Sequence, residues 1–117
     1  MVSNARPAGQ SSVAMVTTFH RVVVASAEQS VLLDLPATVQ AVYQCSWHGD
    51  DLLLATDDGL WRAAQLFADV QYSRVTGLPQ GQVYAIMPGD CLGEFVLLGE
   101  DWTGLWTDGG LQEQRPV

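Results

Sequence analysis

The apolar residues of this chain fall into short runs that are separated by turn-forming residues. Residues 52–56 (LLLAT) are almost entirely apolar and lead into Asp57-Asp58-Gly59, after which Leu60-Trp61 opens another apolar run. An Asp-Gly pair between two apolar runs is among the strongest short signals for a β-hairpin. The pattern therefore predicts paired antiparallel strands over residues 52–56 and 59–65.

Two more runs of the same kind flank this hairpin. Residues 39–45 (VQAVYQC) are rich in β-forming residues, and residues 70–76 (VQYSRVT) alternate in polarity. Turn-forming residues separate or end these runs, so we expect one sheet of four short antiparallel strands. Residues 62–69 contain good helix formers, and a short helix is the alternative to a strand end followed by a loop. We favour the strand end, because a segment of this length is marginal as a helix.

The hairpin and its flank occur a second time. Residues 95–106 (FVLLGEDWTGLW) repeat the plan of the first hairpin, and their Gly-Leu-Trp lies 45 residues after the first one. Residues 33–44 (LDLPATVQAVYQ) match residues 76–87 (TGLPQGQVYAIM), with the Leu-Pro pairs 43 residues apart and Val39 and Val83 44 apart. Two landmarks in the same order indicate one structural repeat of about 44 residues.

The rest of the chain supplies incomplete copies. The second unit has strands predicted over residues 83–87, 95–99 and 104–110, with no convincing fourth strand before Val117. Three strand-like runs precede the first unit, at residues 13–19, 22–26 and 31–35. We therefore predict a flexible N-terminus over residues 1–11 and one β-repeat domain over residues 12–117. Its parts are a partial repeat, 12–36, and two repeats, 37–79 and 80–117.

The two hairpins resemble those of a known group of repeats. "DLLLATDDGLWRAA" and "FVLLGEDWTGLWTDGG" are similar to the hairpins of WD40/YVTN/BNR-like β-propellers of the sortilin and regulator-propeller type, and "LPQGQVYAIMPGD" resembles the start of such a blade. The resemblance implies an all-β fold of antiparallel four-stranded β-meanders that form propeller blades. The chain lacks both the Gly-His…Trp-Asp pair of a WD40 blade and a full Asp box, so no activity follows from the resemblance.

The length allows about two and a half to three such blades, whereas propellers close with about four to eight. The ring is therefore expected to be incomplete. One outcome is a ring segment that other copies or another polypeptide complete. The others are a split propeller, and a small β-sandwich or barrel whose strands only look like blades.

One rim of such blades is the candidate interaction surface. Successive turns of a meander alternate between its two ends, so the second–third strand turns share an end with the connections between blades. This end would gather carboxylates, amides and an exposed tryptophan, and exposed tryptophans anchor protein interfaces. The predicted surface comprises Asp57, Asp58, Gln80, Gln82, Glu100, Asp101 and Trp102. The simpler interpretation of Asp57 and Asp58 is that they form the turn.

The composition of the chain limits the classes of molecule that it is expected to bind. Thirteen acidic residues against five basic ones give a net charge of −8, which disfavours nucleic acid. No apolar run reaches the ~20 residues that a transmembrane helix needs, and the N-terminus lacks the apolar core of a secretion signal. We therefore expect a cytoplasmic protein with no membrane span.

Other candidate chemistry is sparse. His48 lies beside Asp50 and Asp51, but one histidine on a tight turn makes a poor metal site, and we predict a solvated turn with no metal and no cofactor. Cys45 reads as a small buried hydrophobe, Cys91 as an exposed residue, and their pairing stays open.

Trp61 and Trp106 occupy matching places in the two hairpins and are predicted to pack between sheets. No nucleophile, metalloprotease or phosphate-binding motif is present. The sequence therefore favours a non-enzymatic protein interaction or scaffold module that acts as a subunit of a larger assembly, with a protein partner or itself. The alternatives are a propeller fragment that binds a small ligand or Ca²⁺ and a fragment of a propeller hydrolase or lyase.

Overall fold

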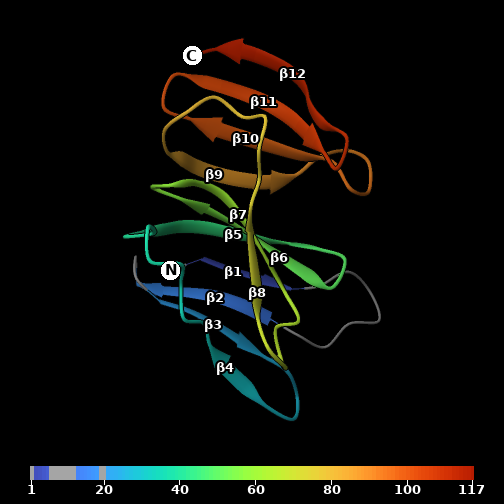
Figure 1. The fold of residues 1–117 in the computed structure, drawn as a ribbon. Helices are drawn as coiled ribbons and strands as arrows, with labels where there is room; N and C mark the ends of the chain where they lie inside the picture. Colours follow the sequence, from blue (N-terminus) through green and yellow to red (C-terminus); the bar gives the residue numbers. More distant parts are fainter. Residues whose placement is uncertain (1, 6–12, 19–20) are drawn as a thin grey trace.

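The structure, a computed structural model, describes residues 2–5, 13–18 and 21–117, and within residues 2–18 the only side chain it describes is that of Ala14. The described residues form twelve β-strands and no helix. The strands make three four-stranded antiparallel sheets, each a meander in which neighbours along the chain pair (Figure 1). These open sheets do not close into a barrel. The predicted all-β class with four-stranded antiparallel meanders is therefore confirmed.

The strands follow the chain in three groups of four. The first sheet consists of β1 (Val2–Ala5), β2 (Val13–Thr18), β3 (Arg21–Ala25) and β4 (Ser30–Leu32). The second consists of β5 (Val42–His48), β6 (Asp51–Thr56), β7 (Gly59–Ala64) and β8 (Gln71–Arg74). The third consists of β9 (Val83–Pro88), β10 (Phe95–Gly99), β11 (Trp102–Thr107) and β12 (Gly110–Pro116).

Two strands lie where none was predicted. Gly110–Pro116 forms β12, the fourth strand of the third sheet, although its residues read as polar and exposed. Val2–Ala5 forms β1, although it falls within the N-terminus expected to be flexible. Both strands run along the edge of a sheet, where pairing on one side does not require the apolar alternation that marks a half-buried strand.

The predicted β6–β7 hairpin is present, and its turn chemistry explains it. Gly59 has a φ of 88°, a value that glycine adopts without steric cost. The Thr56 hydroxyl donates to the Gly59 carbonyl at 2.8 Å and accepts the Asp58 N–H at 3.0 Å. Beyond β7, residues 65–70 form a loop, so the alternative of a short helix over residues 62–69 is wrong.

Strand pairing shows which residues of the two hairpins are equivalent. Ala55 pairs with Leu60, and Leu98 pairs with Thr103, so the hairpins superimpose at an offset of 43 residues. The Gly-Leu-Trp motifs, 45 residues apart, are therefore out of step by two positions. Trp106 corresponds to Ala63 rather than to Trp61.

The same comparison corrects the predicted start of the repeat. Val42 pairs with Thr56, and Val83 pairs with Gly99, so Val83 corresponds to Val42. Val39, the predicted counterpart of Val83, lies in the loop before β5, where it is buried. The repeat is thus real, although its length varies between strands because the loops differ.

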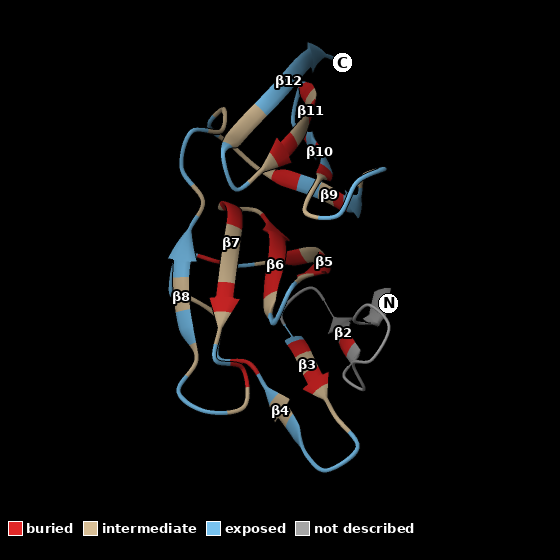
Figure 2. Cartoon of the chain, turned by 90° about the vertical axis from the view of Figure 1, so that its right-hand side faces the viewer, coloured by how far each residue is buried: buried red, intermediate tan, exposed pale blue. Residues whose placement is uncertain are grey.

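The three sheets stack face to face, with the second one in the middle (Figure 1). β5 contacts β1, β2 and β9, and β6 also contacts β9, so the sheets meet chiefly through their first and second strands. Two cores fill the stack: one between the first and second sheets, and one between the second and third. In Figure 2 buried positions lie on β3 of the first sheet and on the first three strands of the second and third sheets, whereas β8 and β12 are largely exposed.

Trp61 and Trp106 both pack between sheets, as predicted, but in different cores. Trp61 is half-buried against the core between the first and second sheets, where Leu54 is its paired residue. Trp106 is buried in the core between the second and third sheets, opposite Phe95.

Candidate functional site

The structure brings most of the predicted rim together at one end of the strands. The β6–β7 turn contacts the loop that enters β5, and the β10–β11 turn contacts the loop that enters β9. The predicted alternation of turns is therefore present. The polar groups of this acidic rim are Asp57, Asp58, Gln80, Gln82, Glu100 and Asp101.

Asp57 bonds to the backbone of its own repeat. Its Oδ1 accepts the N–H groups of Gln40 and Ala41, each at 2.9 Å, and its own N–H donates to the Ala41 carbonyl at 3.1 Å. These bonds tie the β6–β7 turn to the residues that lead into β5. A carboxylate that accepts two backbone N–H groups stabilises the folded chain. Asp57 is therefore a structural residue of the turn, which is the simpler of the two interpretations of its sequence position.

Glu100 occupies the position in the third sheet that Asp57 has in the second, at the same offset of 43 residues. Its Oε1 accepts the Gln82 N–H at 3.5 Å and the Gln82 side-chain amide at 3.4 Å. Gly81, with a φ of 109°, leaves room for this carboxylate because a Cβ there would press against it. The same device, an acidic turn residue that holds the entering strand, is thus used twice.

Asp58 also points inward. Its Oδ2 accepts the Thr38 hydroxyl at 2.6 Å, and its Oδ1 lies 3.3 Å from a guanidinium nitrogen of Arg74. A further link joins the second and third sheets, since the Tyr43 hydroxyl donates to the side-chain carbonyl of Gln82. Burial, and then the nearby charge of Asp57, raise the pKa of the Tyr43 hydroxyl.

Trp102 is not the exposed anchor that was predicted. It starts β11, and its side chain is buried in the core between the second and third sheets, against the Cα of Gly99. The Gly-Glu-Asp-Trp turn resembles Thr56–Gly59, so Trp102 stands where Gly59 does and faces the second sheet. Only Gln80, Glu100 and Asp101 of the predicted surface are exposed, and without an aromatic anchor the acidic rim loses its main argument as an interface.

His48 belongs to a polar link between the second and third sheets at the opposite end of the strands. Its Nε2 lies 2.9 Å from Oδ2 of Asp108, and its ring packs edge-on to Phe95 at 5.2 Å. The solvated turn that was predicted is therefore wrong for this side chain, which is 15% exposed.

Arg62 completes this link. It donates to Asp51 at 2.7 Å within its own sheet and to Asp108 at 3.0 Å in the next one. The hydrogen bond from His48, and then that from Arg62, lower the pKa of the Asp108 carboxyl against the opposing effect of its partial burial.

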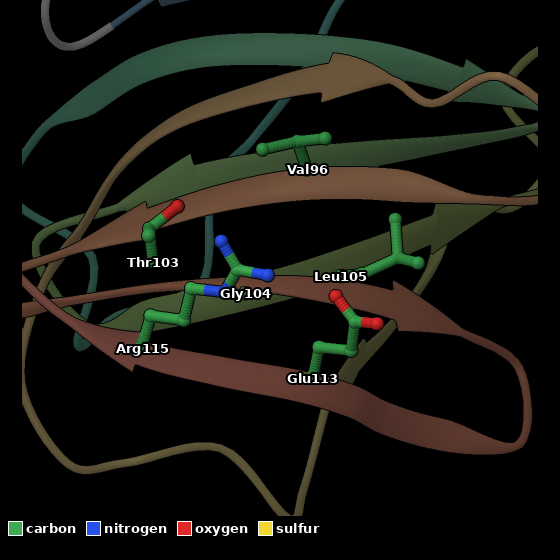
Figure 3. A pocket seen from close by; sticks show the side chains of 6 residues that line it. All are labelled: Val96, Thr103, Gly104, Leu105, Glu113 and Arg115. Atoms are coloured by element: carbon green, nitrogen blue, oxygen red, sulfur yellow. The ribbon is translucent and has the colours of Figure 1, made fainter.

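A surface that the sequence analysis missed lies on the outer face of the third sheet, the face turned away from the second. Met87, Val96 and Leu98 on this face are 56%, 36% and 39% exposed. A shallow groove of about 220 Å³ runs along it, lined by Val96, Thr103, Gly104, Leu105, Glu113 and Arg115. In Figure 3 the side chains of Glu113 and Arg115 extend from β12 toward β11, between Thr103 and Leu105.

The sequence held one signal for this outer face. Residues 95–99 (FVLLG) have no polar side chain, as is also true of residues 52–55 of the middle sheet, and such runs are typical of strands covered on both faces. In β6 both faces are buried, whereas in β10 alternate residues are buried and exposed.

The described residues offer few groups for metal or membrane chemistry. In residues 2–5, 13–18 and 21–117 no three His, Cys, Asp or Glu side chains are grouped to hold a metal ion. Cys45 is buried and Cys91 exposed, as predicted. None of these described segments forms a helix that is long and apolar enough to cross a bilayer.

Comparison of the chain with family models, with curated proteins and with solved structures found no match.

Proposed function

We propose that this chain is a non-enzymatic protein interaction module that acts as a subunit of a larger assembly, with its three sheets serving as consecutive blades of a propeller-like array. One observation carries the proposal: the outer face of the third sheet exposes apolar side chains on β9 and β10 that nothing in the described chain covers. Val96 and Leu98 correspond to Leu53 and Ala55 of the middle sheet, and the exposed fraction of both those side chains is 0%.

The comparison between the two sheets supports an assembly. In the middle sheet this face packs against the next sheet of the stack, so the same strand positions form an interface wherever a neighbour is present. Contiguous apolar surface of this kind marks sites of protein association. Propellers are likewise built from consecutive four-stranded meanders, and this likeness supports the propeller-like array.

The acidic rim is secondary in this proposal. Its carboxylates Asp57, Asp58 and Glu100 bond to the chain itself, and Trp102 is buried. Partner binding is therefore assigned to the outer face rather than to the rim that the sequence favoured.

Site-specific photo-crosslinking tests the proposal. Benzoylphenylalanine placed at position 96 in the groove should give discrete adducts in the cells that make the protein, and mass spectrometry should identify the partner. The matched control is the same residue at position 92, since Leu92 is 96% exposed but lies in the β9–β10 loop. Equal adduct patterns at the two positions, or none at position 96, would remove the proposal.

A further inference from the structure

We infer that the occupant of the outer face of the third sheet is the first sheet of a second copy of this chain. This inference rests on the proposed function and names its partner. Two copies that meet in this way at both ends would form a closed array of six four-stranded sheets.

Inside one chain, the structure shows what covers such a face. Leu53, Ala55 and Leu60 of the second sheet are fully buried by the third sheet. Ala14, Val22 and Val24 of the first sheet are likewise fully buried in the core shared with the second sheet. We call the face of a sheet that is turned toward the next sheet along the chain its forward face, and the opposite face its backward face. In the first and second sheets, the forward face is thus covered by the backward face of the sheet that follows.

The third sheet has the same forward face without the following sheet. Its Val96, Leu98 and Thr103 stand at the positions of Leu53, Ala55 and Leu60. Met87 stands at the position of Ser46, which is 1% exposed, because Met87 pairs with Val96 as Ser46 pairs with Leu53. The structure that is complementary to this face is therefore the backward face of another four-stranded sheet.

The first sheet offers such a backward face. Val22 and Val24 point toward the second sheet, so Val23 and Ala25 between and beside them lie on the opposite side, where both are half-buried. Leu32 pairs with Val23, shares this side and is 53% exposed. The stack therefore ends in two faces that expose apolar side chains, one of them forward and one backward.

Two such ends on one molecule produce a head-to-tail contact. Head-to-tail contacts generate a ring when the rotation between copies closes and a filament when it does not. Two copies with three sheets each supply six sheets, which falls within the about four to eight blades of closed propellers. Closure then buries both faces of both copies.

The experiment measures native mass by sedimentation velocity, for the whole chain and for variants of each face. The wild-type chain of 12.7 kDa should sediment as a two-copy species. Leu98→Glu on the forward face and Leu32→Glu on the backward face should each weaken self-association at least about a hundredfold, because each places an unpaired carboxylate in the interface. Leu92→Glu, in the exposed loop, should leave the mass unchanged.

Mixing the two variants distinguishes this geometry from others. Leu98→Glu protein keeps its backward face and Leu32→Glu protein keeps its forward face, so an equimolar mixture should recover a two-copy species through one intact contact. If the forward faces instead met each other across a two-fold axis, Leu32→Glu protein would stay dimeric and the mixture would gain nothing.

The failure of this inference and the failure of the proposed function look different. A monomeric wild-type chain whose position-96 crosslinks join a different protein would overturn the second copy as partner and leave the assembly role in place. A monomeric chain with no specific position-96 adduct would overturn both. Normal far-ultraviolet circular dichroism for each variant ensures that a lost assembly is not lost folding.

Discussion

Asp57 and Glu100 show how one acidic residue serves the same purpose in two consecutive sheets. Each follows the second strand of its sheet, and each accepts an N–H group from the segment that leads into the first strand. This bond fastens the strand along which neighbouring sheets meet. The sequence predicted that these two carboxylates belong to an interaction surface, but both form hydrogen bonds within the chain.

Replacement of Asp57 by Ala should therefore destabilise the fold rather than a partner contact. The Gln40 and Ala41 N–H groups would lose their acceptor, and we expect a loss of about 1–3 kcal/mol in the free energy of unfolding. Urea unfolding of the purified variant measures it. Asp101→Ala is the matched control, because Asp101 is exposed in the equivalent turn, and its effect should stay within about 0.5 kcal/mol. Equal stability of the two variants would assign Asp57 to the surface.

Gly99 is a second residue with a structural role, because the neighbouring Trp102 side chain leaves no room for a Cβ at this position. A Cβ at this position would overlap the indole of Trp102, which lies against the glycine backbone. Gly99→Ala should force the indole or the strand to move and cost about 1–3 kcal/mol in thermal or urea unfolding. Gly109→Ala, where the nearest atoms leave ordinary contact distances, is the control and should be close to neutral.

At the level of single residues, the sequence predicted the turns correctly but did not predict which neighbours a side chain contacts. The Asp-Gly hairpin at Gly59 followed from local conformational preference, because the turn depends on the few residues within it. The burial of Trp102 did not follow, since a tryptophan beside an acidic turn can point to either face of its strand. Its direction depends on pairing with β10, and the misaligned Gly-Leu-Trp motif hid that register.

At the level of elements, the sheets are joined by polar links at both strand ends as well as by their cores. His48 and Arg62 of the second sheet both bond to Asp108 of the third, in the turn between β11 and β12. Tyr43 and Gln82 form the link at the other end. These contacts connect residues 39 to 60 positions apart, which no local pattern reveals.

The Asp108 link predicts a small pH dependence of stability. The pKa of the Asp108 carboxyl is lower in the folded chain than its ordinary value of 3.8, chiefly because of the His48 hydrogen bond. Its contribution is therefore full above that ordinary value and disappears as the pH falls through the lowered folded pKa. Because the Asp108 side chain is 60% exposed, we expect well under about 1 kcal/mol.

Comparison with an Asp108→Asn variant isolates this contribution. The stability of the wild type and that of the variant in thermal unfolding should differ above about pH 4 and converge as the pH falls below that value. A difference that persists unchanged at low pH would mean that the side chain acts through packing or turn geometry and not through its charge.

Strand prediction was good wherever a strand carries a run of apolar side chains, and it failed for β1 and β12, which are two of the edge strands. The runs in β6 and β10 were placed almost to the residue, since burial demands continuous or alternating apolar side chains. β12 was missed because most of its residues are exposed and polar, and what holds it is backbone pairing with β11. Backbone pairing has no signature in side-chain type.

At the level of the whole molecule, the stack is complete in its middle and open at its ends. The second sheet is covered on both faces, and the third sheet repeats its apolar forward face with nothing upon it in a single chain. The sequence predicted the repeated unit and an incomplete ring. It did not predict which faces stay uncovered, because that depends on the direction in which successive sheets stack.

The net charge of −8 makes a salt-dependence prediction for assembly. Two copies of an acidic chain repel each other, and this repulsion opposes the apolar contact between forward and backward faces. Raising NaCl from about 0.05 M to about 1 M shortens the range of charge interactions to about 3 Å, so self-association should tighten with salt. Sedimentation equilibrium across this range measures the dissociation constant.

The direction of the salt effect separates the apolar interface from an acidic one. If the acidic rim bound a basic surface of the partner copy, attraction between opposite charges would be screened and salt would weaken the complex. Leu98→Glu protein provides the control, since it retains the acidic rim and loses only the forward face. Salt-dependent tightening of the wild type, with the variant monomeric throughout, would place the contact on Met87, Val96 and Leu98.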